Sequence, residues 1–189
     1  MLVVGLGNPG RAYAATRHNL GARAVRLLAQ RHRVRLPPDP AGALVGRSGS
    51  PPEELYLAIP QTAMNHSGTV VRAMADRLRL VEPDRLIVVH DELDLPVGRL
   101  QVKVGGGTAG HKGLRSIVDA LGTAGFVRVR IGIGKPPSSD AGTEYVLSGP
   151  GPDVRERLDA MTELAVDAVE CIVADGAGVA MTRFNRRGG

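Results

Sequence analysis

The first nineteen residues join a short apolar run to a glycine-rich turn and then to a cluster of polar side chains. Leu2, Val3 and Val4 are typical of a buried strand. Glycines at positions 5, 7 and 10, with Pro9 between them, then break regular structure and allow a ligand to approach the backbone closely. The polar side chains of this segment are Asn8, Arg11, Tyr13, Thr16, Arg17, His18 and Asn19. A buried strand that leads into such a turn predicts a site at the carboxyl end of a parallel sheet.

The same turn matches the dinucleotide-binding pattern Gly-x-Gly-x-x-Gly. That motif also needs a helix that opens at its third glycine and a carboxylate about 20 residues further on. Pro9 lies inside the turn, the segment Tyr13–Asn19 is too polar for a helix packed on a sheet, and residues 30–33 carry no carboxylate. A nicotinamide oxidoreductase is therefore a disfavoured alternative, and a thermal shift with NAD or NADP would test it.

Strands alternate with helices along most of the chain. Apolar runs predict strands at residues 2–4, 43–47, 55–59, 86–89, 100–104 and 127–134. Apolar stripes of helical spacing predict helices around residues 25–29, 70–78, 114–121 and 154–172. This order predicts an α/β three-layer sandwich, with helices on both faces of a mostly parallel mixed, twisted sheet that can include an antiparallel edge. We expect one domain over residues 1–189, a polar loop at 135–142 and a short frayed basic tail from about residue 183.

The charge balance indicates an anionic partner. The chain has a formal net charge of +5, and its sequence pI is near 10.0. Nucleic acid is the usual partner of such a chain, although a solvated arginine-rich surface gives the same balance. Aromatic residues make up only 3% of the sequence. Because few rings are available to stack on bases, we expect phosphate contacts to dominate any RNA binding.

Location and redox state follow from what the sequence lacks. No apolar run approaches the roughly 18 residues that a membrane span requires. Met1 leads directly into a predicted strand, so we expect no signal peptide. Cys171 is the single cysteine and lies in an apolar helical stretch, which excludes an internal disulfide and suits a buried thiol in a reducing compartment. These features predict a cytoplasmic protein that does not enter a membrane.

Three strand ends and a fourth turn deliver polar residues to the edge at which parallel strands finish. These residues are Asn8 and His18, Met64 and Asn65, Asp91 and Asp94, and His111 and Lys112. A histidine facing an aspartate, with amides nearby and no serine or cysteine placed as a nucleophile, predicts a dyad that activates water. Asp91 would hold the imidazole tautomer, and an amide would stabilise the oxyanion. The predicted chemistry is hydrolysis of an ester or similar acyl bond without a covalent intermediate.

A metal site is an alternative use of the same region. Its potential ligands are His66, His90 and His111 with Asp91, Glu92 and Asp94. Their spacing matches no metal-binding pattern, so we predict no metal.

Several long motifs in series resemble bacterial peptidyl-tRNA hydrolases. They are Gly5-Leu-Gly-Asn-Pro-Gly10 with Tyr13 and Thr16-Arg-His-Asn19, Pro60-x-Thr-x-Met-Asn-x-Ser-Gly68, His90-Asp-Glu-Leu-Asp-Leu-Pro96, Gly105-Gly-Gly107 with Gly110-His111, and Arg130-Ile-Gly-Ile-Gly134. Their order and spacing hold from Met1 to about Gly178, which is nearly the whole chain. The resemblance implies an enzyme that cleaves the ester between a peptide and the 3′ ribose of tRNA and so recycles tRNA.

The resemblance also implies roles for individual residues. His18 matches the family's catalytic base, Asp91 the aspartate that orients it, and Asn8 and Asn65 the asparagines that hold substrate and attacking water. By the same resemblance, the site also includes Tyr13 and Met64 in the crevice near the tRNA end, and Lys103 and Arg130 as the clamp on the tRNA 5′ phosphate. The family works without metal or other cofactor and usually as a monomer.

Two positions depart from the family pattern. Lys112 stands where the family normally has asparagine, and Ala63 stands where it usually has phenylalanine. An ammonium group donates hydrogen bonds but cannot accept them. Lys112 therefore remains a candidate for oxyanion or phosphate binding, but it cannot accept a hydrogen bond from water or ribose. Both departures leave open a catalytically weakened paralogue that binds tRNA or ribosomal RNA.

Overall fold

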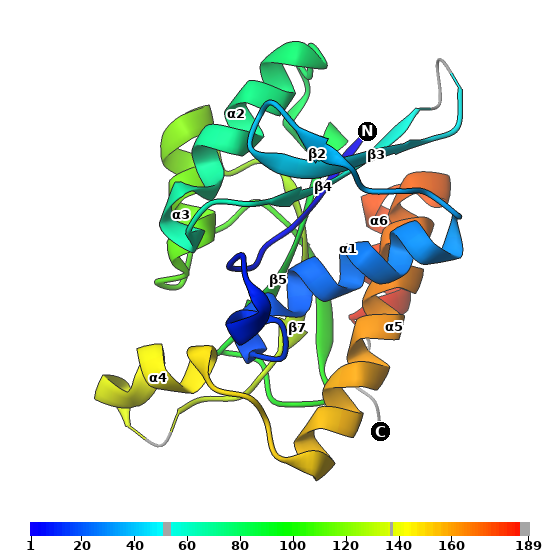
Figure 1. Cartoon of the computed structure of the whole chain (residues 1–189). Coiled ribbons are helices and arrows are strands. Elements are labelled where there is room, and N and C mark those ends of the chain that lie inside the picture. Colours follow the sequence, from blue (N-terminus) through cyan, green and yellow to red (C-terminus); the bar gives the residue numbers. More distant parts are fainter. Residues whose placement is uncertain (51–53, 137, 186–189) are drawn as a thin grey trace.

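The computed structural model describes residues 1–50, 54–136 and 138–185, which form a seven-stranded mixed sheet between two layers of helices (Figure 1). The strand order across the sheet is β2-β3-β4-β1-β5-β7-β6. The strands are β1 (Leu2–Gly5), β2 (Pro38–Asp39), β3 (Ala43–Ser48), β4 (Leu55–Pro60), β5 (Leu86–Glu92), β6 (Leu100–Val104) and β7 (Val127–Gly132).

The four central strands, β4, β1, β5 and β7, run parallel, and antiparallel strands flank them on both sides. The sequence predicted the mixed sheet but suggested an antiparallel strand at one edge only. A parallel β6 would have to start at the same end of the sheet as β5, and the seven residues 93–99 are too few for the chain to return there. β6 therefore runs antiparallel to its neighbour β7. The strands predicted at residues 43–47 and 55–59 are β3 and β4, which pair antiparallel, and residues 51–53 lie outside the described part of the chain.

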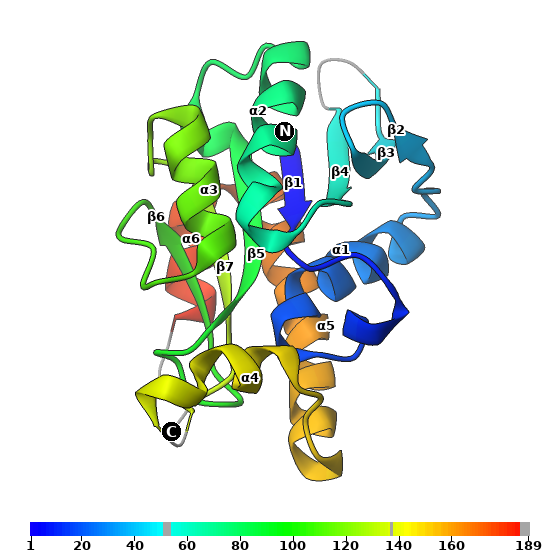
Figure 2. The ribbon, with the colours of Figure 1, turned by 60° about the vertical axis from the view of Figure 1, so that its left-hand side comes forward.

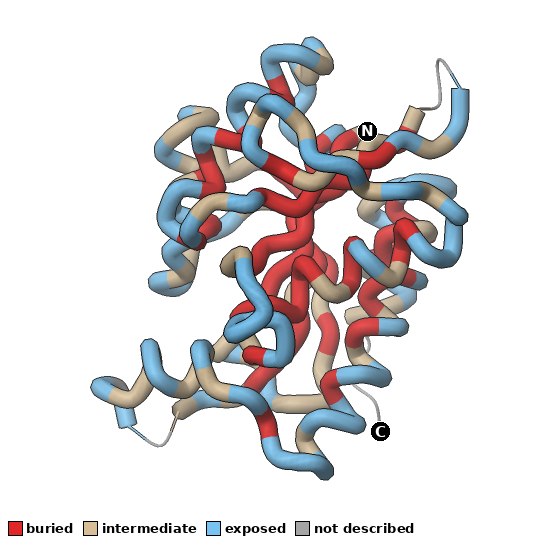
Figure 3. Tube along the Cα trace, viewed as in Figure 1, coloured by how far each residue is buried: buried red, intermediate tan, exposed pale blue. Residues whose placement is uncertain are grey.

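Helices cover both faces of the sheet, which confirms the three-layer fold (Figure 2). One layer contains α1 (Leu20–Arg31), α5 (Pro152–Asp175) and α6 (Ala177–Phe184), and the other contains α2 (Ser67–Arg77) and α3 (Lys112–Leu121). Alternate strand residues enter two hydrophobic cores, with Val3 in the first and Leu2 and Val4 in the second. Buried positions accordingly run along the central strands (Figure 3). Within the described residues, no helix is both long and apolar enough to cross a membrane.

Two segments predicted to be irregular are partly helical. The predicted loop 135–142 leads instead into a 3₁₀ turn (Ser139–Ala141) and a short helix, α4 (Gly142–Leu147). None of the α4 residues is fully buried, so the sequence carries no apolar stripe there that would have signalled a helix.

The frayed tail was predicted to start at about residue 183, but the chain is still ordered there. Arg183 lies inside α6, and the Asn185 side chain makes two hydrogen bonds with the backbone of Val102 on β6. Asn185 Nδ2 donates to the Val102 carbonyl at 2.8 Å, and its Oδ1 accepts from the Val102 amide at 2.7 Å. Residues 186–189 lie outside the described part of the chain.

Candidate active site

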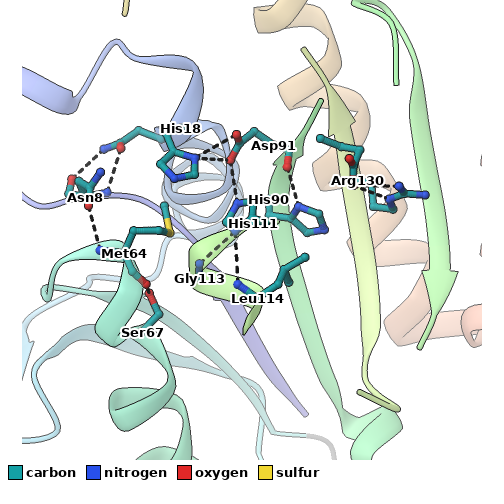
Figure 4. Close-up of polar contacts among 12 residues, drawn as sticks. Asn8, His18, Met64, Ser67, His90, Asp91, His111, Gly113, Leu114 and Arg130 are labelled. Carbon is teal, nitrogen blue, oxygen red and sulfur yellow. Dashed lines mark hydrogen bonds and ion pairs between the residues drawn. The ribbon is translucent and has the colours of Figure 1, made fainter. Parts of the chain in front are cut away.

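His18 and Asp91, 73 residues apart in sequence, form a buried hydrogen-bonded pair (Figure 4). His18 lies in a 3₁₀ turn, Arg17–Asn19, directly before α1, and Asp91 is the penultimate residue of β5. The His18 Nδ1 atom lies 3.0 Å from both carboxylate oxygens of Asp91. The predicted contact between these two residues is therefore confirmed.

A close approach of α1 to β5 brings the pair together. Gly21, in the first turn of α1, faces the backbone carbonyl of Val89, and a side-chain carbon at Gly21 would collide with that oxygen. The backbone amide of Leu6 donates to the same carbonyl, and the amide of Ala22 donates to the Leu6 carbonyl. This glycine therefore sets the spacing that lets His18 reach the end of β5.

His111 is a second imidazole on the same carboxylate. Its Nε2 atom lies 3.1 Å from Asp91 Oδ1, while its Nδ1 atom accepts hydrogen bonds from the backbone amides of Gly113 and Leu114 at 3.1 and 3.3 Å. Because a ring nitrogen that accepts from an amide carries no proton, the proton of neutral His111 must be on Nε2. His111 thus caps α3 and donates to Asp91 at the same time.

Asp91 is ionised within this environment. Burial alone would raise the pKa of its carboxyl group, but the electrostatic attraction of the His111 and His18 imidazoles and the hydrogen bonds from them outweigh burial and hold the pKa well below its usual range. An ionised carboxylate only accepts, so His18 Nδ1 carries a proton and donates it to Asp91. The His18 Nε2 atom then holds a lone pair and, within the described residues, makes no hydrogen bond.

His90 makes a hydrogen bond to the backbone of Asp91. It is fully buried, and its Nδ1 donates to the backbone carbonyl of Asp91 at 2.6 Å. Burial and the neighbouring His111 lower the pKa of His90 to about 3, so the ring is neutral. Its ring meets that of His111 edge to face, with the centroids 5.1 Å apart.

Asn8 links three loops at the site. Its Oδ1 accepts from the Met64 amide at 2.9 Å, its backbone amide donates to Asn19 Oδ1 at 2.9 Å, and its carbonyl accepts from Asn19 Nδ2 at 2.8 Å. The two bonds with Asn19 hold the Asn8 backbone, and the bond from Met64 holds its side chain, whose Nδ2 group has no partner in the described part of the chain. That amino group is available to donate to a substrate oxygen.

A cavity of about 400 Å³ opens at these groups. Of the residues predicted for the site, its lining includes Asn8, His18, Met64, Asn65, Asp91 and Lys112. Ala63 and His111 also line it, and Leu93, Val146 and Leu147 give it an apolar part, the last two from α4. Lys112, the first residue of α3, is exposed, and its ammonium group has no ion pair within the described residues.

Tyr13 is not among the residues that line this cavity, and its place near the tRNA end stays a prediction. Its side chain is 39% exposed on the short 3₁₀ turn Arg11–Tyr13. The backbone of Tyr13 serves the turn instead, because its carbonyl accepts from the amide and the hydroxyl of Thr16.

Lys103 and Arg130 also lie outside the cavity lining, on β6 and β7. Lys103 is exposed, and among the residues that the structure describes its ammonium group has no ion pair. Arg130 is mostly covered, and its Nε and Nη2 atoms lie 3.0 and 2.8 Å from Glu92 Oε2, while Nη1 donates to Gln101. Glu92 thus compensates the charge of Arg130, which sequence reasoning could not foresee.

Arg128 has a structural role that the sequence did not indicate. Its side chain is buried, and it donates to the carbonyls of Gly107 and Gly106 at 2.6 and 2.7 Å. Burial lowers the pKa of its guanidinium group. Arg128 therefore fixes the glycine-rich loop that leads to His111.

The site does not suit a metal, although the ligand atoms of His18, Asp91 and His111 lie within 4.8 Å of one another. A metal-bound histidine normally donates its second ring N–H to a neighbouring acceptor. In His111 that second nitrogen, Nδ1, already accepts from two backbone amides, so it cannot carry the proton. The three residues are arranged to share protons.

Comparisons with known proteins agree on one family. The family model described as "Peptidyl-tRNA hydrolase" matches residues 2–188. The chain is 43% identical to a peptidyl-tRNA hydrolase of Syntrophotalea carbinolica and 45% identical to one of Mycobacterium tuberculosis, in each case over 98% of this chain and 97% of the relative. A crystal structure of peptidyl-tRNA hydrolase from Acinetobacter baumannii superposes with a TM-score of 0.91 at 36% identity, covering 97% of this chain and 93% of that one. This chain belongs to the peptidyl-tRNA hydrolase family.

Proposed function

We propose that this protein hydrolyses the ester bond between a peptide, or an N-blocked amino acid, and the 3′ ribose of tRNA, and so returns tRNA to translation. The observation that carries the proposal is the buried contact between His18 Nδ1 and both carboxylate oxygens of Asp91, each at 3.0 Å. Asp91 holds the proton of His18 on Nδ1, which leaves Nε2 at the cavity wall as a general base.

The reaction needs one water molecule. His18 Nε2 takes a proton from the water as its oxygen attacks the ester carbonyl, and Asp91 stabilises the imidazolium that forms. Asn8 Nδ2, Asn65 or Lys112 donates to the developing oxyanion. When the ester C–O bond breaks, His18 returns the proton to the leaving 3′ oxygen, which yields a free carboxylic acid and tRNA.

Met64 lines the cavity beside Asn65, at the position proposed for the 3′ end of the tRNA. Lys103 is exposed and free to contact the tRNA 5′ phosphate. Arg130 would share its charge between that phosphate and Glu92, with which it already pairs. The protein acts as a single-domain monomer in the cytoplasm, on the acceptor stem of its substrate and without metal or cofactor.

A binding protein without efficient hydrolysis is the alternative suggested by Lys112 and Ala63. Binding alone would not require a buried imidazole–carboxylate pair with a free base nitrogen, so the dyad supports hydrolysis.

Release of the acyl group from N-acetyl-aminoacyl-tRNA by the purified protein tests the proposal. We expect His18→Ala to lose about 10²–10⁴-fold in kcat, the usual contribution of a positioned base, while binding of the tRNA is largely retained. His32→Ala is the control, because His32 is an exposed histidine at the end of α1, where it pairs with Glu170, and it lines neither described cavity. Near wild-type turnover in His18→Ala would refute the mechanism. Bound tRNA without acyl release by the wild-type protein would favour the binding protein.

A further inference from the structure

A second cavity, of about 350 Å³, also has Asn8 in its lining but includes neither His18 nor Asp91. Three arginines line it, Arg11 from the first 3₁₀ turn and Arg23 and Arg26 from α1. Gln61, just after β4, adds a carboxamide to its wall. Asn8 is part of the lining of both cavities, so the arginine-lined cavity directly adjoins the active site.

The charge in this cavity is not balanced from within the protein. Arg23 donates to Asp159 of α5. Across the described ranges of the chain, the guanidinium groups of Arg11 and Arg26 make no hydrogen bond or ion pair, and no carboxylate lines the cavity. A guanidinium group presents its N–H donors in a planar fork that matches a carboxylate or a phosphate. The cavity is therefore suited to an anionic group of a bound molecule.

The order of the strands indicates which part of the substrate reaches this cavity. Asp91 lies on β5, with β1 on one side of it and β7 and then β6 on the other. The arginine-lined cavity belongs to the β1 and β4 side, whereas Lys103 and Arg130 lie on β6 and β7. If the tRNA approaches over the β6 and β7 side, the acyl chain leaves the ester on the opposite side, past Asn8. Because Asn8 lines both cavities, an extended peptide, which advances about 3.3–3.6 Å per residue, can pass from one to the other within a few residues.

We propose that the arginine-lined cavity is a subsite for the peptide part of the substrate and that Arg11 and Arg26 bind an acidic side chain there. This inference rests on the proposed hydrolysis of peptidyl-tRNA and adds a preference among substrates. Peptides with a glutamate or aspartate a few residues from the ester bind better than their amide counterparts.

Paired substrates test the preference. Short N-acetyl-peptides are attached to one and the same tRNA, with Glu or Gln placed at the second, third or fourth residue from the ester. We expect the wild-type kcat/KM ratio of Glu over Gln to reach about threefold to fivefold at one of these positions at low salt, as for a partly exposed ion pair. Raising the salt concentration should lower this ratio.

Matched arginine variants assign the preference to the cavity. The double variant Arg11→Gln, Arg26→Gln should bring the Glu/Gln ratio close to one. Arg72→Gln should keep the wild-type ratio, because Arg72 is exposed on α2, where it pairs with Asp76.

Two results would overturn the subsite. One is a wild-type ratio of one at every position. The other is an equal loss on the Glu and Gln substrates together with weaker binding of deacylated tRNA, which would assign the arginines to RNA phosphate. The dissociation constants of the Glu and Gln substrates on His18→Ala give the same preference without turnover. This measurement therefore separates a failure of the subsite from a failure of the proposed hydrolysis.

Discussion

Replacing Asp91 by asparagine should place a proton on the wrong nitrogen of His18. A carboxamide has one acceptor oxygen and one donor NH₂ group, whereas the carboxylate of Asp91 accepts from both imidazoles. His111 cannot adapt, because its Nδ1 is held by two backbone amides and its proton must stay on Nε2. The carboxamide oxygen of Asp91→Asn therefore turns to His111, and its NH₂ group faces His18 Nδ1. His18 then shifts its proton to Nε2 and cannot accept one from water.

The expected loss is that of a general base, about 10³-fold in kcat, or about 4 kcal/mol of transition-state stabilisation. Substrate binding should change little, because Asp91 is only 2% exposed and its carboxylate is engaged by two imidazoles. Both hydrogen bonds of the side chain survive in the new arrangement, so the free energy of unfolding should change by only about 1 kcal/mol.

Single-turnover release of acetyl-aminoacyl groups from tRNA measures the effect, with urea unfolding to verify the fold. Asp94→Asn is the matched control, since Asp94 is exposed and pairs with Lys135 at 3.5 Å. The double variant Asp91→Asn, His111→Ala frees the carboxamide to turn its oxygen toward His18, so it should regain part of the lost activity. A fall of less than tenfold in Asp91→Asn, or no recovery in the double variant, would refute the tautomer argument.

Two further predictions concern neighbouring residues. Lys112→Asn should raise kcat/KM a few-fold, because a carboxamide at the cavity wall both donates and accepts hydrogen bonds; a clear drop would show that the lysine has its own role. His90 should make stability fall in acid: its pKa is lowered to about 3 in the folded state, against about 6.5 when unfolded. Its contribution is therefore complete above about pH 6.5 and is lost as the pH falls toward 3, at about 1.4 kcal/mol per pH unit. Urea unfolding between pH 7 and pH 4 should show a steeper loss in the wild type than in His90→Gln, and equal slopes would contradict the neutral buried ring.

Much of the fold was accessible from the sequence because it depends on local patterns. The apolar run at residues 86–89 forms part of β5, and the stripe around Val25 lies on the buried face of α1. α4 was missed because its six residues bury no complete side chain. The second antiparallel edge was missed because the apolar run ends at Val89, whereas β5 continues to Glu92 and leaves only residues 93–99 to connect it to β6.

The part of the candidate site that could be predicted also depends on local sequence patterns. His18 and Asp91 stood out because each follows a strand and belongs to a long motif. The role of His111 depends on which of its ring nitrogens carries the proton. That assignment comes from the two backbone amides at the start of α3 that donate to Nδ1, and the sequence does not show them. The sequence likewise gave no sign that Glu92 neutralises Arg130, since that pairing requires the register of β5 and β7.

The two hydrogen bonds between Asn185 and Val102 have a consequence for self-association. One side-chain amide there takes the place of a neighbouring strand residue, because it satisfies both the donor and the acceptor of an edge position. An incoming β-strand from another copy would have to displace this amide before it could pair with β6 at that point. Asn185, which follows α6, thus protects this position of the edge strand β6 against pairing with a strand of another copy.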